Sequence, residues 1–302
     1  MSTQSLATQA SATPAAVKSD AGQSGSGISA LKIMNYTILV LLTLVFVGPL
    51  FFILMNSFKG RFFISSSPFA LPIGDYFVGL TNYTSGLAVT NFFNAMGWSF
   101  VITIGSVTVI VFFTAMTAYY ITRIKARWTN VVYLIFVFSM IVPFQAVMFP
   151  TIKIADMLGL SNPAGMMVLY LGFGAGLSVF IFSGFVKSIP LEIEEAATID
   201  GCGPLKTYFY IVFPMLKPVA ITVAILNTMW VWNDYLVALI FLGGNPESKV
   251  ITQRLADIVG SRGNDWHLLT AGAFITMLLP LIVFFSLQRF FVRGLLAGSV
   301  KG

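Results

Sequence analysis

The sequence has few charges, one cysteine and one histidine. Only 9% of its 302 residues are charged and 57% are hydrophobic, whereas a soluble domain is about 25% charged and about 45–50% apolar. This balance excludes a soluble enzyme, a disordered chain and an ordinary nucleic-acid-binding domain. Cys202 and His267 each stand alone, which excludes an intrachain disulfide and multi-histidine metal sites. The composition predicts an all-α integral membrane protein.

A phosphate-binding loop is also missing. No segment has the form Gly-x4-Gly-Lys-Ser/Thr, and the run that ends at Lys249 lacks the glycine before its lysine. Because cradling a nucleotide phosphate needs that glycine-rich backbone and lysine, we expect this chain not to bind ATP. No other cofactor and no metal are expected on this chain. If ATP hydrolysis drives the function of this chain, another polypeptide must bind the ATP and its Mg²⁺.

Charge-free runs are long enough to cross a membrane, because a bilayer core needs about 20 apolar residues per helix. The predicted spans are Tyr36–Met55, Gly97–Ile121, Val131–Phe149, Ala164–Phe185, Pro218–Leu242 and Leu268–Gln288. The polar stretch 80–94 reads as a loop. Pro49, Pro143 and Pro280 lie within spans and predict kinks. The glycines of 172–176 predict close helix packing through Gly172 and Gly176, because no strand or acidic partner completes a nucleotide fingerprint.

The distribution of lysine and arginine predicts the orientation. With a cytoplasmic N-terminus, eleven of these residues lie inside and six outside, as the positive-inside rule favours. Both termini are therefore predicted to be cytoplasmic, in a multi-pass membrane protein. The composition of residues 1–29 predicts a disordered cytoplasmic tail. Residues 30–302 are predicted to form the membrane domain. The outer loops, Asn56–Asn94 and Gly243–His267, are long enough to hold short helices and meet a partner.

One predicted cytoplasmic loop, about 187–217, is unlike the rest of the chain. It holds four of the eleven acidic residues, and Pro190 and Gly201 are placed to start and end a short helix. Gly203 is a second candidate for the helix end. The acids complement the positive end of the helix dipole. We expect this helix to dock into a groove on another protein. The alternative, a helix lying on lipid, is disfavoured because anionic headgroups attract basic residues. The candidate contact residues are Glu194, Glu195, Ala196, Ala197, Asp200 and Gly201.

The same loop resembles the EAA loop of ABC-importer permeases. The similarity comprises Glu195-Ala196-Ala197, Asp200-Gly201, and the residues Phe209, Ile211, Phe213, Pro214 and Pro218. Phe213 stands where the family often has leucine. Three further segments resemble maltose-transporter-type sugar permeases, and among these the six-span, MalG-like subunit. They are Asn56-Ser57-Phe58-Lys59, Trp232-Asn233-Asp234-Tyr235 and the ending 294–302. The resemblance covers about residues 30–302.

This resemblance implies a type I ABC importer permease fold with six transmembrane helices and a cytoplasmic coupling helix. It implies a sugar substrate and three kinds of protein partner, namely a second permease subunit, two cytoplasmic ATPase subunits and an extracytoplasmic solute-binding protein. In that family the EAA acid, here Glu195, pairs with a basic residue of the ATPase. The loop Gly243–His267 reaches toward the binding protein, and the C-terminal tail toward the ATPase interface. The resemblance also implies that the chain lies in a prokaryotic plasma (inner) membrane. No nucleic acid is expected as a partner.

Candidate substrate-pathway residues surround Asp234, the only acid within a predicted span. Aromatic, amide and carboxylate groups suit a polyhydroxylated ligand, and an intramembrane acid is costly. Asp234 could equally bond to a neighbouring helix. The candidates are Gln145, Asn227, Trp230, Asn233, Asp234 and Tyr235.

Three other classes of protein are alternatives to a sugar-importing ABC permease. An ion-coupled transporter would usually carry paired repeats and several intramembrane charges, and a membrane enzyme would need clustered titratable groups. The sequence shows neither. An ABC permease for a non-sugar solute is opposed only by the motifs that resemble the maltose type.

Overall fold

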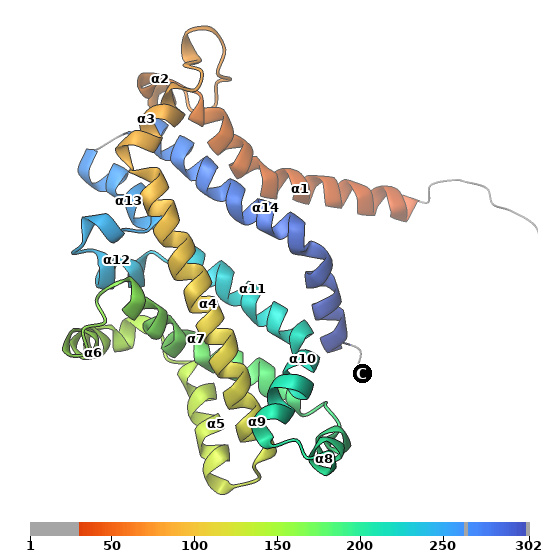
Figure 1. Cartoon of the computed structure of the whole chain (residues 1–302). Helices are drawn as coiled ribbons and strands as arrows, with labels where there is room; N and C mark the ends of the chain where they lie inside the picture. The colour runs from red at the N-terminus through yellow and green to blue at the C-terminus, as the bar shows by residue number, and fades with distance from the viewer. Residues whose placement is uncertain (1–29, 263–264, 300–302) are drawn as a thin grey trace, which may run out of the picture. The chain divides into compact units, whose positions relative to one another are not determined.

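The computed structural model describes residues 30–262 and 265–299, so the predicted tail at 1–29 and the last residues 300–302 lie outside the described part. Figure 1 shows the helices, and within the described residues there is no strand, only an isolated bridge between Lys59 and Phe77. The elements are α1 (Ala30–Ser57), α2 (Arg61–Ser66), η1 (Gly74–Tyr76), α3 (Thr81–Val89), α4 (Phe92–Arg123), α5 (Arg127–Ser139), α6 (Phe144–Met157), α7 (Pro163–Val186), α8 (Leu191–Ile199), α9 (Pro204–Thr207), η2 (Tyr208–Val212), α10 (Phe213–Met215), α11 (Lys217–Asn233), α12 (Leu236–Leu242), η3 (Pro246–Ser248), α13 (Ile251–Arg262) and α14 (Trp266–Ser299).

The chain divides into two units, residues 1–48 and 49–302. The described part of the first unit, 30–48, is one apolar stretch of helix whose large side chains are exposed. The second unit contains the remaining helices. Within it, α4 packs along α7 and α11, and α14 packs on α3, α11 and α13.

Among the described residues, four helices are long and apolar enough to cross a membrane, and they overlap four of the predicted spans. These helices are α1, α4, α7 and residues 266–286 of α14. The predicted stretches Val131–Phe149 and Pro218–Leu242 are not single helices. The number of spans reaches six only if two bent helix pairs, α5 with α6 and α9–α10 with α11, each count as one.

The predicted third span breaks near Pro143. Helix α5 ends at Ser139, α6 starts at Phe144, and the two are bent by 110°. Pro143 is extended, with ψ of 141°, and the residue before a proline also avoids the helical region. Pro49 and Pro280, in contrast, lie inside continuous helices. Pro143 therefore marks a break rather than the kink that the sequence predicted.

Two buried clusters position the site. One, which includes Ala118, Phe182 and Tyr208, joins α4, α7 and the segment after α8. The other, which includes Ile110, Tyr170 and Phe241, joins α4, α7 and α12. A side chain at Gly176 would meet the carbonyl of Phe136 at 2.7 Å, which confirms the predicted close packing there, whereas Gly172 has open space around it.

The predicted outer segments hold short helices, as expected. The stretch 80–94 is not a loop, because α3 and the start of α4 occupy most of it. Lys59 is fully buried there, and its Nζ donates to the carbonyls of Ser67 and Pro68 at 2.9 and 2.8 Å. Burial lowers the pKa of Lys59. Asn82 donates to the carbonyls of Ser57 and Lys59, both at 2.8 Å. The Asn56-Ser57-Phe58-Lys59 motif thus ties α1 to α3.

Candidate functional site

The acidic helix forms where the sequence places it. Pro190 is extended and precedes α8, and Glu192 and Glu194 lie in its first turn. At the other end the amide of Cys202 donates to the carbonyl of Ala197 at 2.9 Å, and the amide of Gly201 donates to Thr198 at 3.0 Å. These two bonds make a Schellman motif, which needs a left-handed residue after the helix.

Gly201 supplies that left-handed residue, with φ of +80°. Gly203, the other glycine predicted to end the helix, has φ of −74° and precedes α9 instead. The prediction is therefore confirmed at Gly201 and wrong at Gly203. The chain then continues through α9 and the π-helix η2 into α10 and α11, and buried Tyr208 and Val212 fix this return to the core.

Helix α8 has an exposed face and a buried face. Four residues of α8 follow the spacing i, i+3, i+4, i+7, which places them on one side of the helix. They are Glu192, Glu195, Ala196 and Ile199. All four are exposed, and Ile199 is 86% exposed. Asp200 is also exposed, at the helix end. We call residues 192, 195, 196 and 199 the docking face.

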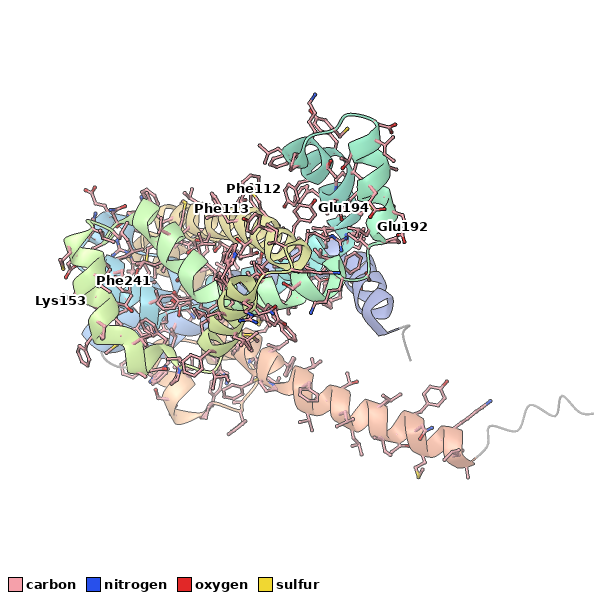
Figure 2. The ribbon with its side chains drawn as sticks, turned by 90° about the horizontal axis from the view of Figure 1, so that it is seen from below. Phe112, Phe113, Lys153, Glu192, Glu194 and Phe241 are labelled. Atoms are coloured by element: carbon pink, nitrogen blue, oxygen red, sulfur yellow. The ribbon has the colours of Figure 1, made fainter. Side chains whose placement is uncertain are left out.

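The buried face of α8 is fixed by an ion pair to α4. The carboxylate of Glu194 lies 2.6 Å from Nη2 of Arg123 and accepts from the hydroxyl of Tyr119 at 2.9 Å. Arg123 also donates to the carbonyl of Ile189 at 3.0 Å. The two charged side chains are only 18% and 10% exposed. Figure 2 labels Glu194 and Glu192 on α8.

This geometry divides the six predicted contact residues. Glu195 and Ala196 belong to the docking face, whereas Glu194 and Ala197 are buried, at 8% and 4% exposure. The carboxylate of Glu194 is occupied inside the chain, so we reassign it from partner contact to anchor. The sequence prediction missed Arg123 and Tyr119. Arg123 entered it only as part of the basic cluster that set the orientation.

Asp234 lies at a break in the predicted fifth span. It follows α11 and precedes α12, and its carboxylate accepts from the hydroxyl of Tyr170 at 2.8 Å and the amide of Ala238 at 3.2 Å. Its carbonyl accepts from Thr252 at 2.9 Å. The ring of Trp230 stands edge-on to that of Tyr170. Of the two open interpretations, the structure shows the bond to a neighbouring helix, through Tyr170.

The other pathway candidates differ in their burial and in their hydrogen bonds. Asn227 is buried, and its amide donates to Ser178 at 3.1 Å, so it joins α11 to α7. Trp230 and Tyr235 are 39% and 40% exposed, and Asn233 and Gln145 are also exposed. Gln145 lies in the first turn of α6, and no hydrogen bond found among the described residues joins it to Asp234. In that same part of the chain no three His, Cys, Asp or Glu residues are grouped to hold a metal.

The fold and the anchored helix define an integral membrane transport component. Residues 110–296 match the family described as "binding-protein-dependent transport system inner membrane component". The chain belongs to this family, so it is a multi-pass transport subunit of ABC importers rather than a catalytic enzyme, and a solute-binding protein is its partner.

Curated relatives and a solved structure agree with this assignment. The chain is 34% identical to the probable starch degradation products transport system permease protein AmyC of Thermoanaerobacterium thermosulfurigenes, over 87% of this chain and 94% of AmyC. It is 34% identical to the multiple sugar-binding transport system permease protein MsmG of Streptococcus mutans, over 88% of this chain and 96% of MsmG. A chain of a bacterial ABC transporter for alginate import shares the fold, with a TM-score of 0.72, 23% identity, and coverage of 89% of this chain and 98% of that chain.

Proposed function

We propose that this chain is a permease subunit of an ATP-driven carbohydrate importer and that the docking face of α8 couples it to a cytoplasmic ATPase. The observation that carries the proposal is the division of α8 into two faces. Glu194 and Arg123 hold the helix on α4, and the opposite side leaves Glu195, Ala196 and Ile199 exposed. An apolar anchor beside an acid, on a small-residue surface, suits insertion into a groove of a partner that carries a basic residue.

The assembly we propose contains a second permease subunit, two ATPase subunits and an extracytoplasmic binding protein. ATP and Mg²⁺ bind to the ATPases, because this sequence has no phosphate-binding loop. The outer segment with η3 and α13 is our candidate contact for the binding protein. The names of the relatives AmyC and MsmG support a carbohydrate cargo.

A second cargo class has one observation in its favour. The chain is also 35% identical, over 76% of its length, to the osmoprotective compounds uptake permease protein GgtD of Synechocystis. Binding of radiolabelled oligosaccharides and small osmoprotectants to the purified binding protein separates the two cargoes. We expect saturable binding of the oligosaccharides.

Charge reversal at Glu195 tests the coupling. In the assembled transporter, Glu195→Lys should preserve membrane levels, because exposed substitutions usually change stability by less than about 0.5 kcal/mol. Sugar uptake and the stimulation of ATP hydrolysis by the binding protein should fall at least about tenfold, because leaving a buried partner charge unpaired costs about 2–5 kcal/mol. An acid introduced at the facing ATPase position should partly restore uptake.

The matched control is Asp156→Lys, which reverses another exposed acid, near the end of α6 and outside the predicted partner segments. It should leave uptake and membrane levels unchanged. Wild-type uptake by Glu195→Lys, or loss of uptake only through degradation, would contradict the coupling role.

The orientation of α8 has its own test. In a Cys202→Ser background, Ser85→Cys on α3 and Ser188→Cys before α8 place single thiols at two exposed positions. A membrane-impermeant thiol reagent should label position 85 in intact cells and position 188 only after lysis. The reverse pattern would remove α8 from the cytoplasm and from any ATPase.

A further inference from the structure

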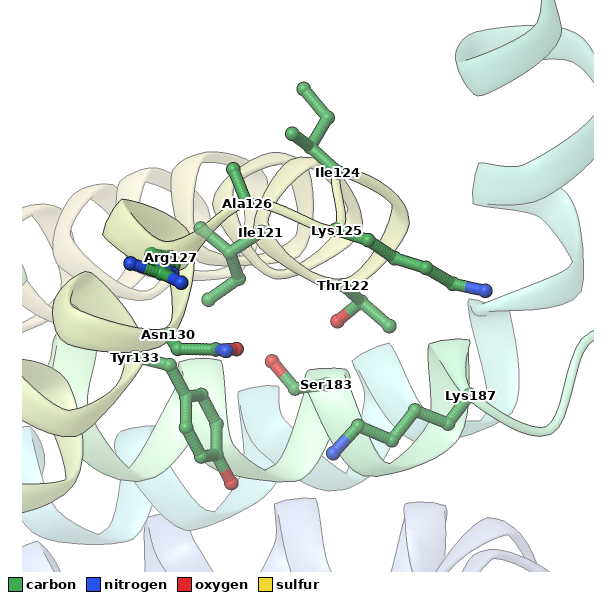
Figure 3. A pocket seen from close by; sticks show the side chains of 10 residues that line it. All are labelled: Ile121, Thr122, Ile124, Lys125, Ala126, Arg127, Asn130, Tyr133, Ser183 and Lys187. Atoms are coloured by element: carbon green, nitrogen blue, oxygen red, sulfur yellow. The ribbon is translucent and has the colours of Figure 1, made fainter.

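A second site lies at the ends of α4, α5 and α7, on the side that the lysine and arginine distribution places in the cytoplasm. It is a cavity of about 310 Å³, lined by residues of the α4 end, the α4–α5 connection, the α5 start and the α7 end. We call it the basic pocket (Figure 3). The residues that matter for its chemistry are Thr122, Lys125, Arg127, Asn130, Ser183 and Lys187.

The pocket carries positive charge without an acid. Lys125, Arg127 and Lys187 line it, and none of its ten lining residues is Asp or Glu. Glu194, the acid that pairs with nearby Arg123, is already neutralised by that arginine. Lys187 also lies 5.5 Å from the ring centre of Tyr133, which places its ammonium beside the pocket wall. Three cations with no carboxylate favour an anionic ligand.

A buried hydroxyl in the pocket lacks a partner. Ser183 is 1% exposed, and its Oγ has no hydrogen-bond partner in the structure. The neighbouring helical serine Ser178 bonds back to the carbonyl of Gly174 at 2.7 Å, and Ser188 bonds back to Phe185 at 2.7 Å. Ser183 makes no such bond, although leaving a buried donor unsatisfied destabilises a fold. Its hydroxyl is therefore available to a ligand.

Other donors converge on the same space. Figure 3 shows the hydroxyls of Ser183 and Thr122 and the amide of Asn130 directed into the pocket, with Lys125 and Arg127 on either side. Helix α5 starts at Arg127, and its preceding residue Ala126 provides no side-chain cap. The first-turn amides of an uncapped helix carry partial positive charge and bind anionic oxygens. Neutral donors, helix amides and cations together match the oxygens of a phosphate group.

We propose that the basic pocket binds a phosphate group, and that an anionic membrane phospholipid supplies it. The pocket lies at the ends of α4 and α7, two helices long enough to cross the membrane. Trp128 and Tyr120, which flank lining residues of the pocket in the sequence, lie with their ring centres 5.8 Å apart and are 51% and 49% exposed. Such aromatic residues are enriched at the level of the lipid headgroups. A soluble phosphate compound has the same chemistry and is the other source to test.

The test uses the purified, delipidated transporter and native mass spectrometry with added phosphatidylglycerol. The wild type should retain the lipid, and Lys187→Gln and Ser183→Ala should each retain it about tenfold more weakly, because each removes one donor to the phosphate. Lys153→Gln is the control. Lys153 is an exposed lysine on α6, and Figure 2 shows it on the opposite side of the molecule from Glu192 of α8.

Two further measurements make the result decisive. Inorganic phosphate and glycerol phosphate are added to the wild type in place of lipid. Stabilisation by these compounds that Lys187→Gln abolishes, without lipid retention, would support the phosphate site and assign it to a soluble ligand. Equal lipid retention by wild type, Lys187→Gln and Ser183→Ala would overturn the proposal. So would an equal loss in Lys153→Gln, or equal retention of zwitterionic phosphatidylcholine.

Discussion

Two acidic residues of this chain are each bonded to a tyrosine, but in different electrostatic settings. Glu194 on α8 accepts from Tyr119 and also pairs with Arg123 at 2.6 Å. Asp234, between α11 and α12, accepts from Tyr170 and from the backbone amides of Val237 and Ala238, and the described residues place no lysine or arginine on it. Each tyrosine belongs to a different neighbouring helix, α4 or α7.

The difference separates two uses of a carboxylate. The pair of Glu194 and Arg123 is neutral as a whole, so it can hold α8 on α4 at little electrostatic cost while Glu195 faces outward. Asp234 has hydrogen bonds but no counter-charge, and uncompensated acids within membrane segments are expensive. We therefore expect the first acid to matter mainly through its ion pair and the second through its hydrogen bonds.

The largest effect should come from breaking the ion pair. Glu194→Ala leaves Arg123 partly buried without its partner, and removing one member of a buried pair costs about 3–5 kcal/mol. Because both side chains keep some exposure, we expect the lower end, about 3 kcal/mol. Thermal unfolding of the purified transporter and its abundance in membranes measure the loss.

Glu195→Ala is the control, one residue away on the docking face, and it should change stability by less than about 0.5 kcal/mol. The double variant Glu194→Ala/Arg123→Ala should lose less than the sum of the single variants, because the two residues interact directly. Additive losses would mean that the ion pair does not fasten α8.

Sequence patterns predicted α8 well because its signals are local. Proline before the first turn, acids in that turn and glycine after the last all lie within a dozen residues of the sequence. They could not tell which of two adjacent acids turns inward, because that depends on Arg123, 71 positions away along the chain. The sequence placed Glu194 and Glu195 together as partner contacts. The structure separates them, since only one side of α8 meets α4.

The predicted spans also show that local sequence patterns predict some features of the structure and not others. Continuous apolar runs predicted α1, α4, α7 and α14, because hydropathy and length decide such helices. The break at Pro143 was not predictable from proline alone, since Pro49 and Pro280 remain inside helices. At Pro143 the chain has already left the helix at Ser139, where α5 packs closely on Gly176 of α7. The presence of a proline within an apolar run therefore does not decide whether the helix breaks there.

A smaller effect should follow changes around Asp234. Asp234→Asn keeps an oxygen that accepts from Tyr170 and Ala238. The ratio of folded to unfolded protein and the rate of uptake should therefore each stay within about twofold of the wild type. Asp234→Ala removes the hydrogen bonds of the carboxylate and leaves the buried hydroxyl of Tyr170 unpaired, which should cost about 1–3 kcal/mol. Thermal unfolding and uptake of labelled sugar, measured on the same preparations, separate the two outcomes.

Tyr170→Phe tests the same bond from the other side and should destabilise by a similar amount, because the carboxylate loses its hydroxyl donor. If Asp234→Asn is stable but loses uptake, the charge itself acts in transport. That result would contradict the view that Asp234 matters mainly through its hydrogen bonds.

The smallest effect concerns how α8 ends, and it compares two glycines with the same free space. Neither Gly201 nor Gly203 has a heavy atom within 4 Å of the position that a Cβ would occupy, but φ is +80° at Gly201 and −74° at Gly203. A left-handed conformation costs an L-residue about 1–2 kcal/mol. Gly201→Ala should therefore destabilise the transporter by about 1 kcal/mol and loosen the last turn of α8, with a partial loss of uptake. Gly203→Ala, which meets neither strain nor a clash, should behave like the wild type in both measurements. Hydrogen exchange of the amides of residues 201 and 202 should rise in the first variant only, because those amides donate the bonds that close the helix. Equal behaviour of the two variants would show that the end of α8 does not depend on the left-handed turn.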